Sequence, residues 1–165
     1  MTIGLLSDTH GYLDDKVFYH FEDCDEVWHA GDWGGAEVAN QLKAFKPTRG
    51  VYGNIDGKDI REVFPKDLVF ELEGFKIYIT HIGGYPSKYS PAARLIIEKE
   101  MPQIFICGHS HILKIITDKK YNAMITINPG AAGKHGFQLV STLVKFEISK
   151  GKIFNMKVIE LGTKA

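Results

Sequence analysis

The segment Ile3-Gly4-Leu5-Leu6-Ser7-Asp8-Thr9-His10-Gly11 decides how the rest of the chain can fold. Its apolar half predicts a short buried strand, and its polar half comes where that strand gives way to a glycine. Asp8 and His10 are two positions apart, so their side chains can point the same way. A carboxylate oxygen and an imidazole nitrogen aimed at one point make half of a transition-metal site. A polar strand end in a turn is the simpler reading, but four more ligand-bearing segments follow, each after an apolar run.

Composition limits the chain to a few classes of protein. Its 165 residues, of which 44% are hydrophobic, predict a single domain covering residues 1–165 with a sizeable core. Lys plus Arg and Asp plus Glu both number 20, so the formal net charge is zero and no general polyanion-binding field exists. We therefore expect no extended nucleic acid as a partner. Binding of small phosphate-bearing substrates is still compatible with this composition, because a metal can supply positive charge locally.

The cysteines and the hydropathy pattern indicate a reducing compartment. Cys24 and Cys107 are far apart, and neither a disulfide framework nor a thiolate zinc site is visible. Cys107 lies in an apolar run and is expected to be a small buried hydrophobe. We read no signal peptide at the N-terminus, and no apolar stretch is long enough to span a bilayer. The prediction is a cytoplasmic protein with no membrane partner.

The first third of the chain alternates strands and helices. Two helices, the first with Asp14 as its N-cap, separate three apolar strand segments. This order predicts parallel strands with right-handed crossovers, and sites in such sheets form outside the carboxyl ends of the strands. The strands are expected at residues 3–6, 26–29 and 49–52, and the helices at residues 14–22 and 34–44.

The remaining two thirds read mostly as strands. Glu73-Gly74-Phe75 predicts a hairpin turn, Ser90-Pro91 predicts a helix start, and Lys150-Gly151 predicts a last hairpin. So many strands favour an α/β fold with two sheets face to face and helices outside. The strands are expected at residues 68–72, 76–80, 103–107, 113–117, 124–127, 139–148 and 153–160.

Polar side chains with metal-ligand chemistry gather at the predicted strand ends. One mononuclear site rarely needs so many ligands, whereas two ions that share a bridging carboxylate would use all of them. The absence of thiolates suits manganese, iron, nickel or zinc. Two such ions would turn a bridging water into hydroxide and bind a phosphoryl group, which predicts phosphoester hydrolysis. The residues are Asp8, His10, Asp32, Asn54, His81, His109 and His111.

These segments resemble the calcineurin-like metallophosphoesterase superfamily, whose pattern is DxH, GD, GN, H and GHxH in this order. The short length and Asn128-Pro129-Gly130 look like its small YfcE-like phosphodiesterase branch. The resemblance implies hydrolysis of a small phosphodiester with two divalent ions, Mn²⁺ foremost and Ni²⁺, Fe²⁺ or Zn²⁺ as alternatives. It also implies an α/β four-layer αββα sandwich of two mixed sheets flanked by helices, and a homodimer or homotetramer.

The resemblance assigns a role to each ligand position. It implies that Asp8, His10, Asp32 and His111 hold one ion, with Asp32 bridging to the other. Asn54, His81 and His109 would hold the second ion. Asp32, Asn54 and His81 are accordingly predicted as the catalytic residues.

The chain departs from the family pattern beside the GN motif. Many members carry a histidine directly after this asparagine, where it protonates the leaving group, but here the residue is Ile55. Asp56 is a weak substitute, because a carboxylate beside cations is ordinarily ionised and a poor acid. We therefore expect slow turnover of substrates with poor leaving groups.

Other polar and aromatic residues near the motifs have structural and functional readings. His29 is expected to be a structural histidine that could orient a ligand. Core packing and stacking on a substrate ring compete evenly for Trp33, and Tyr12 could stack in the same way. The remaining residues weighed for contact with substrate are Lys134, His135, Tyr85 and Tyr89.

Three alternatives stand beside the diesterase. A phosphomonoesterase or a nuclease of the same superfamily would use the same ligands, although a nuclease should show a basic groove or an added domain. The third alternative is a non-catalytic, metal-binding interaction scaffold like the retromer subunit Vps29, although a pure scaffold has no physical need for four converging histidines. The complete ligand set therefore favours the enzyme.

Overall fold

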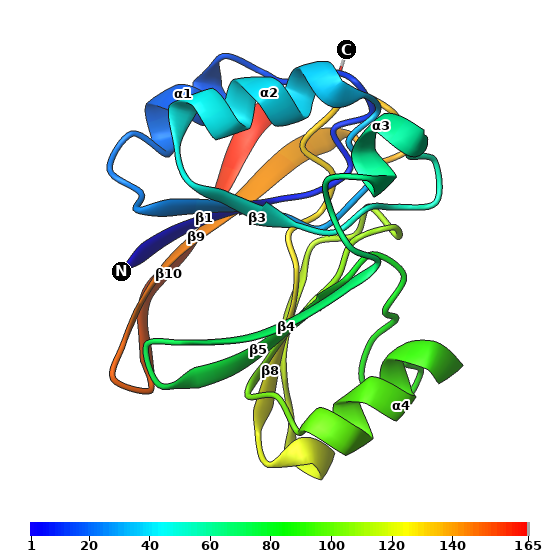
Figure 1. Cartoon of the computed structure of the whole chain (residues 1–165). Coiled ribbons are helices and arrows are strands. Elements are labelled where there is room, and N and C mark those ends of the chain that lie inside the picture. Colours follow the sequence, from blue (N-terminus) through cyan, green and yellow to red (C-terminus); the bar gives the residue numbers. More distant parts are fainter. Residues whose placement is uncertain (165) are drawn as a thin grey trace.

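The computed structural model describes residues 1–164 and has four layers, with two stacked sheets between outer helices (Figure 1). Helices α1 and α2 cover the outer face of one sheet, and α4 covers the outer face of the other. This confirms the predicted αββα sandwich. The strands are β1 (Thr2–Leu6), β2 (Glu26–His29), β3 (Thr48–Gly50), β4 (Asp67–Leu72), β5 (Phe75–Thr80), β6 (Ile104–Ile106), β7 (Lys114–Asp118), β8 (Met124–Asn128), β9 (Val140–Ser149) and β10 (Lys152–Thr163). The helices are α1 (Lys16–His20), α2 (Ala36–Phe45), α3 (Lys58–Arg61), α4 (Pro91–Glu100) and the short 3₁₀ turn η1 (Lys119–Tyr121).

The first sheet has the strand order β10-β9-β1-β2-β3. Strands β1, β2 and β3 are parallel because α1 and α2 carry the chain back across the sheet between them. Strands β9 and β10 come from the C-terminal end and add antiparallel partners beside β1. The carboxyl ends of three successive strands therefore lie at one edge of this sheet.

The second sheet has the order β4-β5-β6-β8-β7. The β4–β5 hairpin closes with Glu73-Gly74, and β5, β6 and β8 run parallel, with β7 antiparallel at the edge. The apolar runs of β5 and β6 are almost wholly buried, as expected for strands covered on both faces. Their carboxyl ends carry the histidine motifs.

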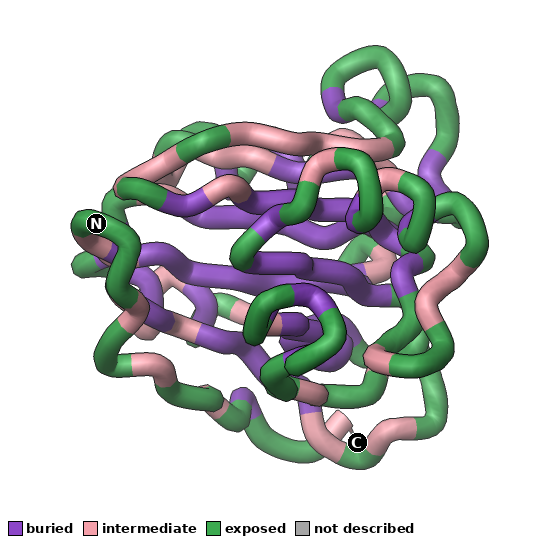
Figure 2. Tube along the Cα trace, turned by 90° about the horizontal axis from the view of Figure 1, so that it is seen from below, coloured by how far each residue is buried: buried purple, intermediate pink, exposed green. Residues whose placement is uncertain are grey.

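The main core lies between the two sheets. Buried segments follow the central strands, while turns and outer loops are exposed (Figure 2). Trp28 of the first sheet packs edge-to-face against Phe70 of the second and against Phe146 on its own sheet. No helix among residues 1–164 is long and apolar enough to cross a membrane.

Local structure differs from the sequence prediction in four places. Helix α3 and the η1 turn were not predicted, because each is shorter than the span over which helical periodicity can be recognised. The N-cap of α1 is Asp15 rather than Asp14, although the Asp14 carboxylate accepts a hydrogen bond from Lys16 N at 2.9 Å. Strand β3 ends at Gly50, earlier than expected. Ser90 is the N-cap of α4 as predicted, and its hydroxyl accepts from Ala93 N.

Candidate metal centre

The predicted ligands come from both sheets and meet at the edge formed by the carboxyl ends of the strands. Asp8, Asp32 and Asn54 follow β1, β2 and β3, the parallel strands of the first sheet. His81 follows β5, and the His109–His111 segment follows β6, both in the second sheet. The convergence arises because parallel strands end at the same edge and the sheets are stacked with these edges together.

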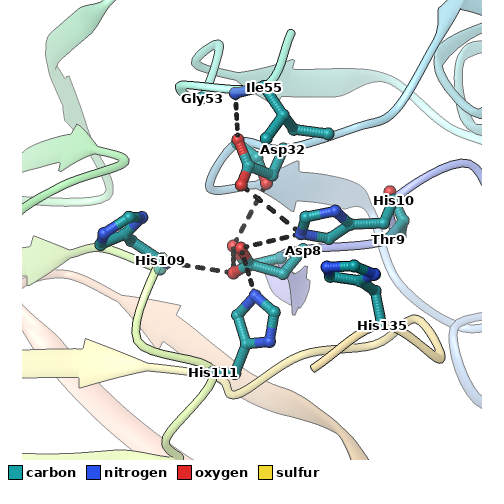
Figure 3. Close-up of polar contacts among 12 residues, drawn as sticks. Asp8, Thr9, His10, Asp32, Gly53, Ile55, His109, His111 and His135 are labelled. Atoms are coloured by element: carbon teal, nitrogen blue, oxygen red, sulfur yellow. Dashed lines mark hydrogen bonds and ion pairs between the residues drawn. The ribbon is translucent and has the colours of Figure 1, made fainter. Parts of the chain in front are cut away.

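Six of these side chains form two groups with the spacing of metal ligands. Asp8, His10 and His111 make the first group, and Asp32, His81 and His109 make the second; within each, the ligand atoms lie within 4.8 Å of one another. Figure 3 shows Asp8, His10, Asp32 and His111 directed at a common centre. The family resemblance implied a slightly different division, with Asp32 among the ligands of the first ion and bridging to the other, and with Asn54 in the second set.

The two groups touch through the Asp32 carboxylate. Asp32 Oδ2 lies 3.2 Å from His81 Nε2 in its own group and 3.5 Å from His10 Nε2 in the first. Asp8 Oδ1 lies 3.2 Å from His111 Nε2, and 3.8 Å from both His10 Nε2 and His81 Nε2. One oxygen of Asp32 thus faces both groups, as a bridging ligand must.

Each carboxylate is oriented by hydrogen bonds to its other oxygen. Asp8 Oδ2 accepts from the Ser7 hydroxyl at 2.6 Å and from the backbone N–H of His109 at 3.1 Å. Asp32 Oδ1 accepts from the backbone N–H of Ile55 at 3.1 Å. The inward oxygen of each is therefore presented in a fixed direction.

Three buried polar atoms of the centre lack a hydrogen-bond partner among residues 1–164. They are Asp8 Oδ1, His10 Nε2 and His81 Nε2. A buried polar atom left unpaired costs about 1–3 kcal/mol, so native structures rarely gather several at one place. Each is a good ligand for a divalent cation, so the residues present fit a bound metal pair.

Charges in the centre shift the acid–base properties of its members. Burial would raise the pKa of Asp8, but the nearby imidazoles of His10 and His111 outweigh it and hold this pKa well below its usual range. The pKa of Asp32 is lowered in the same way, against burial, by the nearby imidazole of His81. Burial would lower the pKa of His81, but Asp32 and Asp8 raise it. Partial burial of its ring lowers the pKa of His109, helped by the nearby charge of His81.

The backbone at the ligands is unusual. Asp8, His10, Asp32, His109 and His111 all have positive φ, between 47° and 70°. This left-handed conformation costs a residue other than glycine about 1 kcal/mol, and Asp and His are among the residues that tolerate it best. The glycine of the GN motif has a different reason, because a Cβ on Gly53 would collide with Asp32.

Asn54 lies on the open side of the second group. Its Oδ1 is 3.0 Å from His109 Nδ1, and both side chains are exposed. All seven predicted positions are therefore brought together, although Asn54 reaches the group only through His109.

Residues behind the centre hold the ligand loops. Gly31 N donates to His29 Nδ1, which leaves His29 Nε2 as the donor to Thr9 Oγ1 at 3.0 Å. Thr9 lies between Asp8 and His10, and Gly31 precedes Asp32, so one neutral ring steadies both loops. Burial lowers the pKa of His29 to about 3, which keeps it neutral. This confirms the structural interpretation of His29.

Three residues considered for contact with the substrate or for proton donation have structural contacts instead. Trp33 is fully buried and stacks between His29 and Phe64, so its reading as a substrate-stacking ring is wrong. The Asp56 carboxylate accepts from the backbone N–H groups of residues 33, 34 and 53, so it is no proton donor to a leaving group. The Tyr89 hydroxyl donates to Asp118, and its ring packs on Phe105 away from the pocket rim.

Asn128 also supports the ligand loops, although in the sequence it stands out only as part of the Asn-Pro-Gly motif. Asn128 Nδ2 donates to Gly108 O at 2.9 Å and to Ser110 Oγ at 3.1 Å, which fixes the loop that carries His109 and His111. The Asn-Pro-Gly motif was the available signal, because an amide side chain at a strand end can hold a neighbouring turn.

Comparison with known proteins agrees with this geometry. Residues 1–151 match the model of the calcineurin-like phosphoesterase superfamily domain. The chain belongs to this superfamily. A probable metallophosphoesterase of Methanothermobacter thermautotrophicus is 29% identical over 136 residues, which cover 79% of this chain and 77% of the relative.

Solved structures share the fold over the full chain. An archaeal phosphodiesterase superposes with a TM-score of 0.74 at 23% identity, covering 98% of this chain and 100% of its own. Vps29 of Chaetomium thermophilum also gives 0.74, at 16% identity and full coverage of both chains. At these identities the likeness establishes the metallophosphatase fold.

Proposed function

We propose that this member of the superfamily is a phosphodiesterase that uses two divalent ions, Mn²⁺ foremost, at the seven predicted ligands. The observation that carries the proposal is the pair of ligand groups with three unpaired buried atoms between them. A scaffold gains nothing from such a cluster, whereas a metal pair relieves it. The archaeal phosphodiesterase with the same fold supports this choice of reaction.

The metal pair would supply an activated water and offset the charge that develops on the phosphoryl oxygens. The chain's own contribution is orientation. Asp32 would ligate both ions, His10 and His111 would complete one side, and His81 and His109 the other. The amide oxygen of Asn54 would ligate without cancelling positive charge, which leaves the centre cationic toward an anionic ester.

The surroundings of the centre suit a diester. A cavity of about 540 Å³ opens beside Asn54 and His81, with Tyr52, Arg61 and Pro91 among its lining residues. This volume is within the range of small-molecule sites and can hold one organic substituent of the phosphate. Ile55 is 47% exposed and has no proton to give, so esters of acidic alcohols should react fastest.

The test compares two chromogenic esters with protein first stripped by a chelator. With added Mn²⁺, bis(p-nitrophenyl) phosphate should be hydrolysed faster than p-nitrophenyl phosphate, and without metal neither should react. Asp32→Asn should abolish the activity, while Asp15→Asn is the matched control because that exposed side chain makes no cap hydrogen bond. Preference for the monoester would establish a phosphomonoesterase, and no turnover with any divalent ion would favour the scaffold.

A further inference from the structure

The segment after β8 folds back onto the metal centre. Ala132 N donates to Ser7 O at 2.8 Å, and Gly133 N donates to Asp8 O at 3.1 Å. The Ser141 hydroxyl also holds this segment in place, because it donates to Gly133 O. The chain therefore leaves Gly133 at the rim of the ligand groups and places the next residues over them.

The residues that follow are held close to the first ligand group. Gly136 packs against the His111 ring so tightly that a Cβ would collide with His111 Nδ1, and its φ is 103°. Lys164 Nζ donates to the backbone carbonyl of His135 at 3.1 Å. Lys134 and His135 are therefore anchored on both sides, at the opposite end of the centre from Asn54.

The two side chains face the site. The His135 ring stacks on the His10 ring, with centroids 4.6 Å apart and planes inclined by 21° (Figure 3). The Lys134 ammonium lies 4.4 Å from the centroid of the Tyr12 ring. Both side chains are exposed, so a ligand at the centre can reach them.

Neither side chain is committed to another polar group. Among residues 1–164, no hydrogen bond or ion pair involves the Lys134 ammonium or the His135 ring. The carboxylates of the centre, Asp8 and Asp32, face the histidine ligands instead. An unpaired ammonium and a ring N–H beside a phosphoryl site are suited to a second anion, because charge-assisted hydrogen bonds to phosphate are strong.

We propose that Lys134 and His135 select phosphodiesters that carry a second anionic group, a phosphate monoester, near the scissile phosphate. This inference rests on the proposed diesterase function and names the substrate class that the same centre prefers. The second phosphate would lie over His10 and Tyr12, while the cavity beside Asn54 and His81 takes the other substituent. Neither residue belongs to the superfamily motif, so the selectivity is a property of this loop.

The kinetic test uses two diesters that differ only in the second phosphate. They are the p-nitrophenyl ester of thymidine 5′-phosphate and the same compound with a 3′-phosphate, and both release p-nitrophenol. The 3′-phosphorylated ester should show a kcat/KM about tenfold higher or more, the effect of one hydrogen bond to a charged group. Lys134→Ala and His135→Ala should remove this preference through KM, and Lys134→Arg should keep most of it.

Lys120→Ala is the matched control, since that ammonium also lies over a tyrosine ring, at 5.5 Å from the Tyr121 centroid, but in the η1 turn. It should leave both rates unchanged. Equal kcat/KM for the two esters in the unaltered protein would overturn the proposal. A His135→Ala loss that is the same for both esters would also contradict it, because the ring would then only support His10.

A binding measurement separates this inference from the proposed function. In metal-free protein, thymidine 3′,5′-bisphosphate should shift the amide NMR signals of residues 133–136 more than thymidine 5′-phosphate does, and Lys134→Ala should remove the difference. If neither ester is hydrolysed, the diesterase proposal fails, and the NMR titration still decides whether the loop binds the second phosphate. Equal shifts with both nucleotides would refute the loop's role even if the enzyme is active.

Discussion

The two ligand groups of this chain differ in how far they are open to solvent. In the first, Asp8 is fully buried, and the side chains of His10 and His111 are 13% and 11% exposed. In the second, Asp32 and His81 are as deep, but His109 is exposed, as is its neighbour Asn54. The first group is thus a closed platform, whereas the second is completed by residues that solvent and substrate can reach. We expect the ion in the second group to exchange faster and to meet the substrate directly.

The largest effect should come from the residue that joins the groups. Asp32→Ala removes the oxygen that faces both His81 and His10, so it should release both ions and lower metal-dependent hydrolysis about a thousandfold or more. Elemental analysis and a chromogenic diester assay measure the two losses, and circular dichroism shows whether the fold is intact. Retention of one ion with substantial activity would show that the groups act separately and that Asp32 does not bridge.

The second prediction separates the groups by their kinetics of metal release. A chelator should remove the two ions in a fast and a slow phase, followed by stopped-flow absorbance. His109→Ala should eliminate the fast phase and His111→Ala the slow one, with affinity at the altered group weakened about tenfold to a hundredfold. A single phase in the unaltered protein, or loss of the same phase in both variants, would contradict the difference in openness.

A smaller effect is expected from the empty proton-donor position on the open side. Ile55 is about half exposed and its backbone N–H already orients Asp32, so a new side chain can be placed there without disturbing the core. Ile55→His should raise the rate on diesters of poor leaving groups by about tenfold, part of the full gain of general acid catalysis. Ile55→Leu should not, and p-nitrophenyl esters should respond little to either change. No gain on poor leaving groups would mean that proton donation does not limit this enzyme.

The smallest effect on catalysis concerns His29, behind the centre, whose burial makes stability depend on pH. The folded pKa of His29 is about 3, below the value of about 6.5 expected in the unfolded chain. Between these pH values the His29 ring is protonated in the unfolded chain but neutral in the folded one. The free energy of unfolding therefore falls as pH drops from 6.5 toward 3. The slope from this group is at most about 1.4 kcal/mol per pH unit.

Urea denaturation of metal-free protein at pH 7, 6 and 5 measures this contribution. His29→Gln should flatten the pH dependence, and His20→Gln is the control, since His20 is a partly exposed helix residue whose ring packs beside Tyr19. An unchanged slope in His29→Gln would assign the acid sensitivity to other groups.

Most of the fold, and the meeting of the candidate ligands at one edge, could be predicted from the sequence, while their roles as metal ligands stay predictions. Short apolar runs ending in Asp, Asn or His locate buried strands and their polar ends independently of tertiary contacts, as in Leu5-Leu6-Ser7-Asp8. Parallel pairing then places the ends together, which is why candidate ligands in both sheets can be proposed before their geometry is known.

What could not be predicted depends on contacts between distant segments. From the sequence, Trp33 is equally suited to core packing and to stacking on a substrate ring. Only the structure shows that His29 and Phe64 stack against it. Asp56 has the carboxyl group that a catalytic acid needs. Only the three backbone N–H groups that donate to it identify it as a structural residue. The fold of the loop over His111 likewise follows from the glycine at position 136 and not from any periodicity. The metal's identity, the oligomeric state and the cytoplasmic location stay predictions.

The left-handed backbone of five ligands has a consequence for how this protein can change over generations. At each of these positions glycine would relax the backbone. At Asp8 and Asp32 it would also remove an acceptor of hydrogen bonds, so replacing a histidine is the change that would stabilise the metal-free fold locally while disabling the centre. A lineage released from the need for catalysis would therefore drift readily toward an inert descendant. Return would be hard, because each restored ligand would lower stability before the full set could repay it by holding an ion.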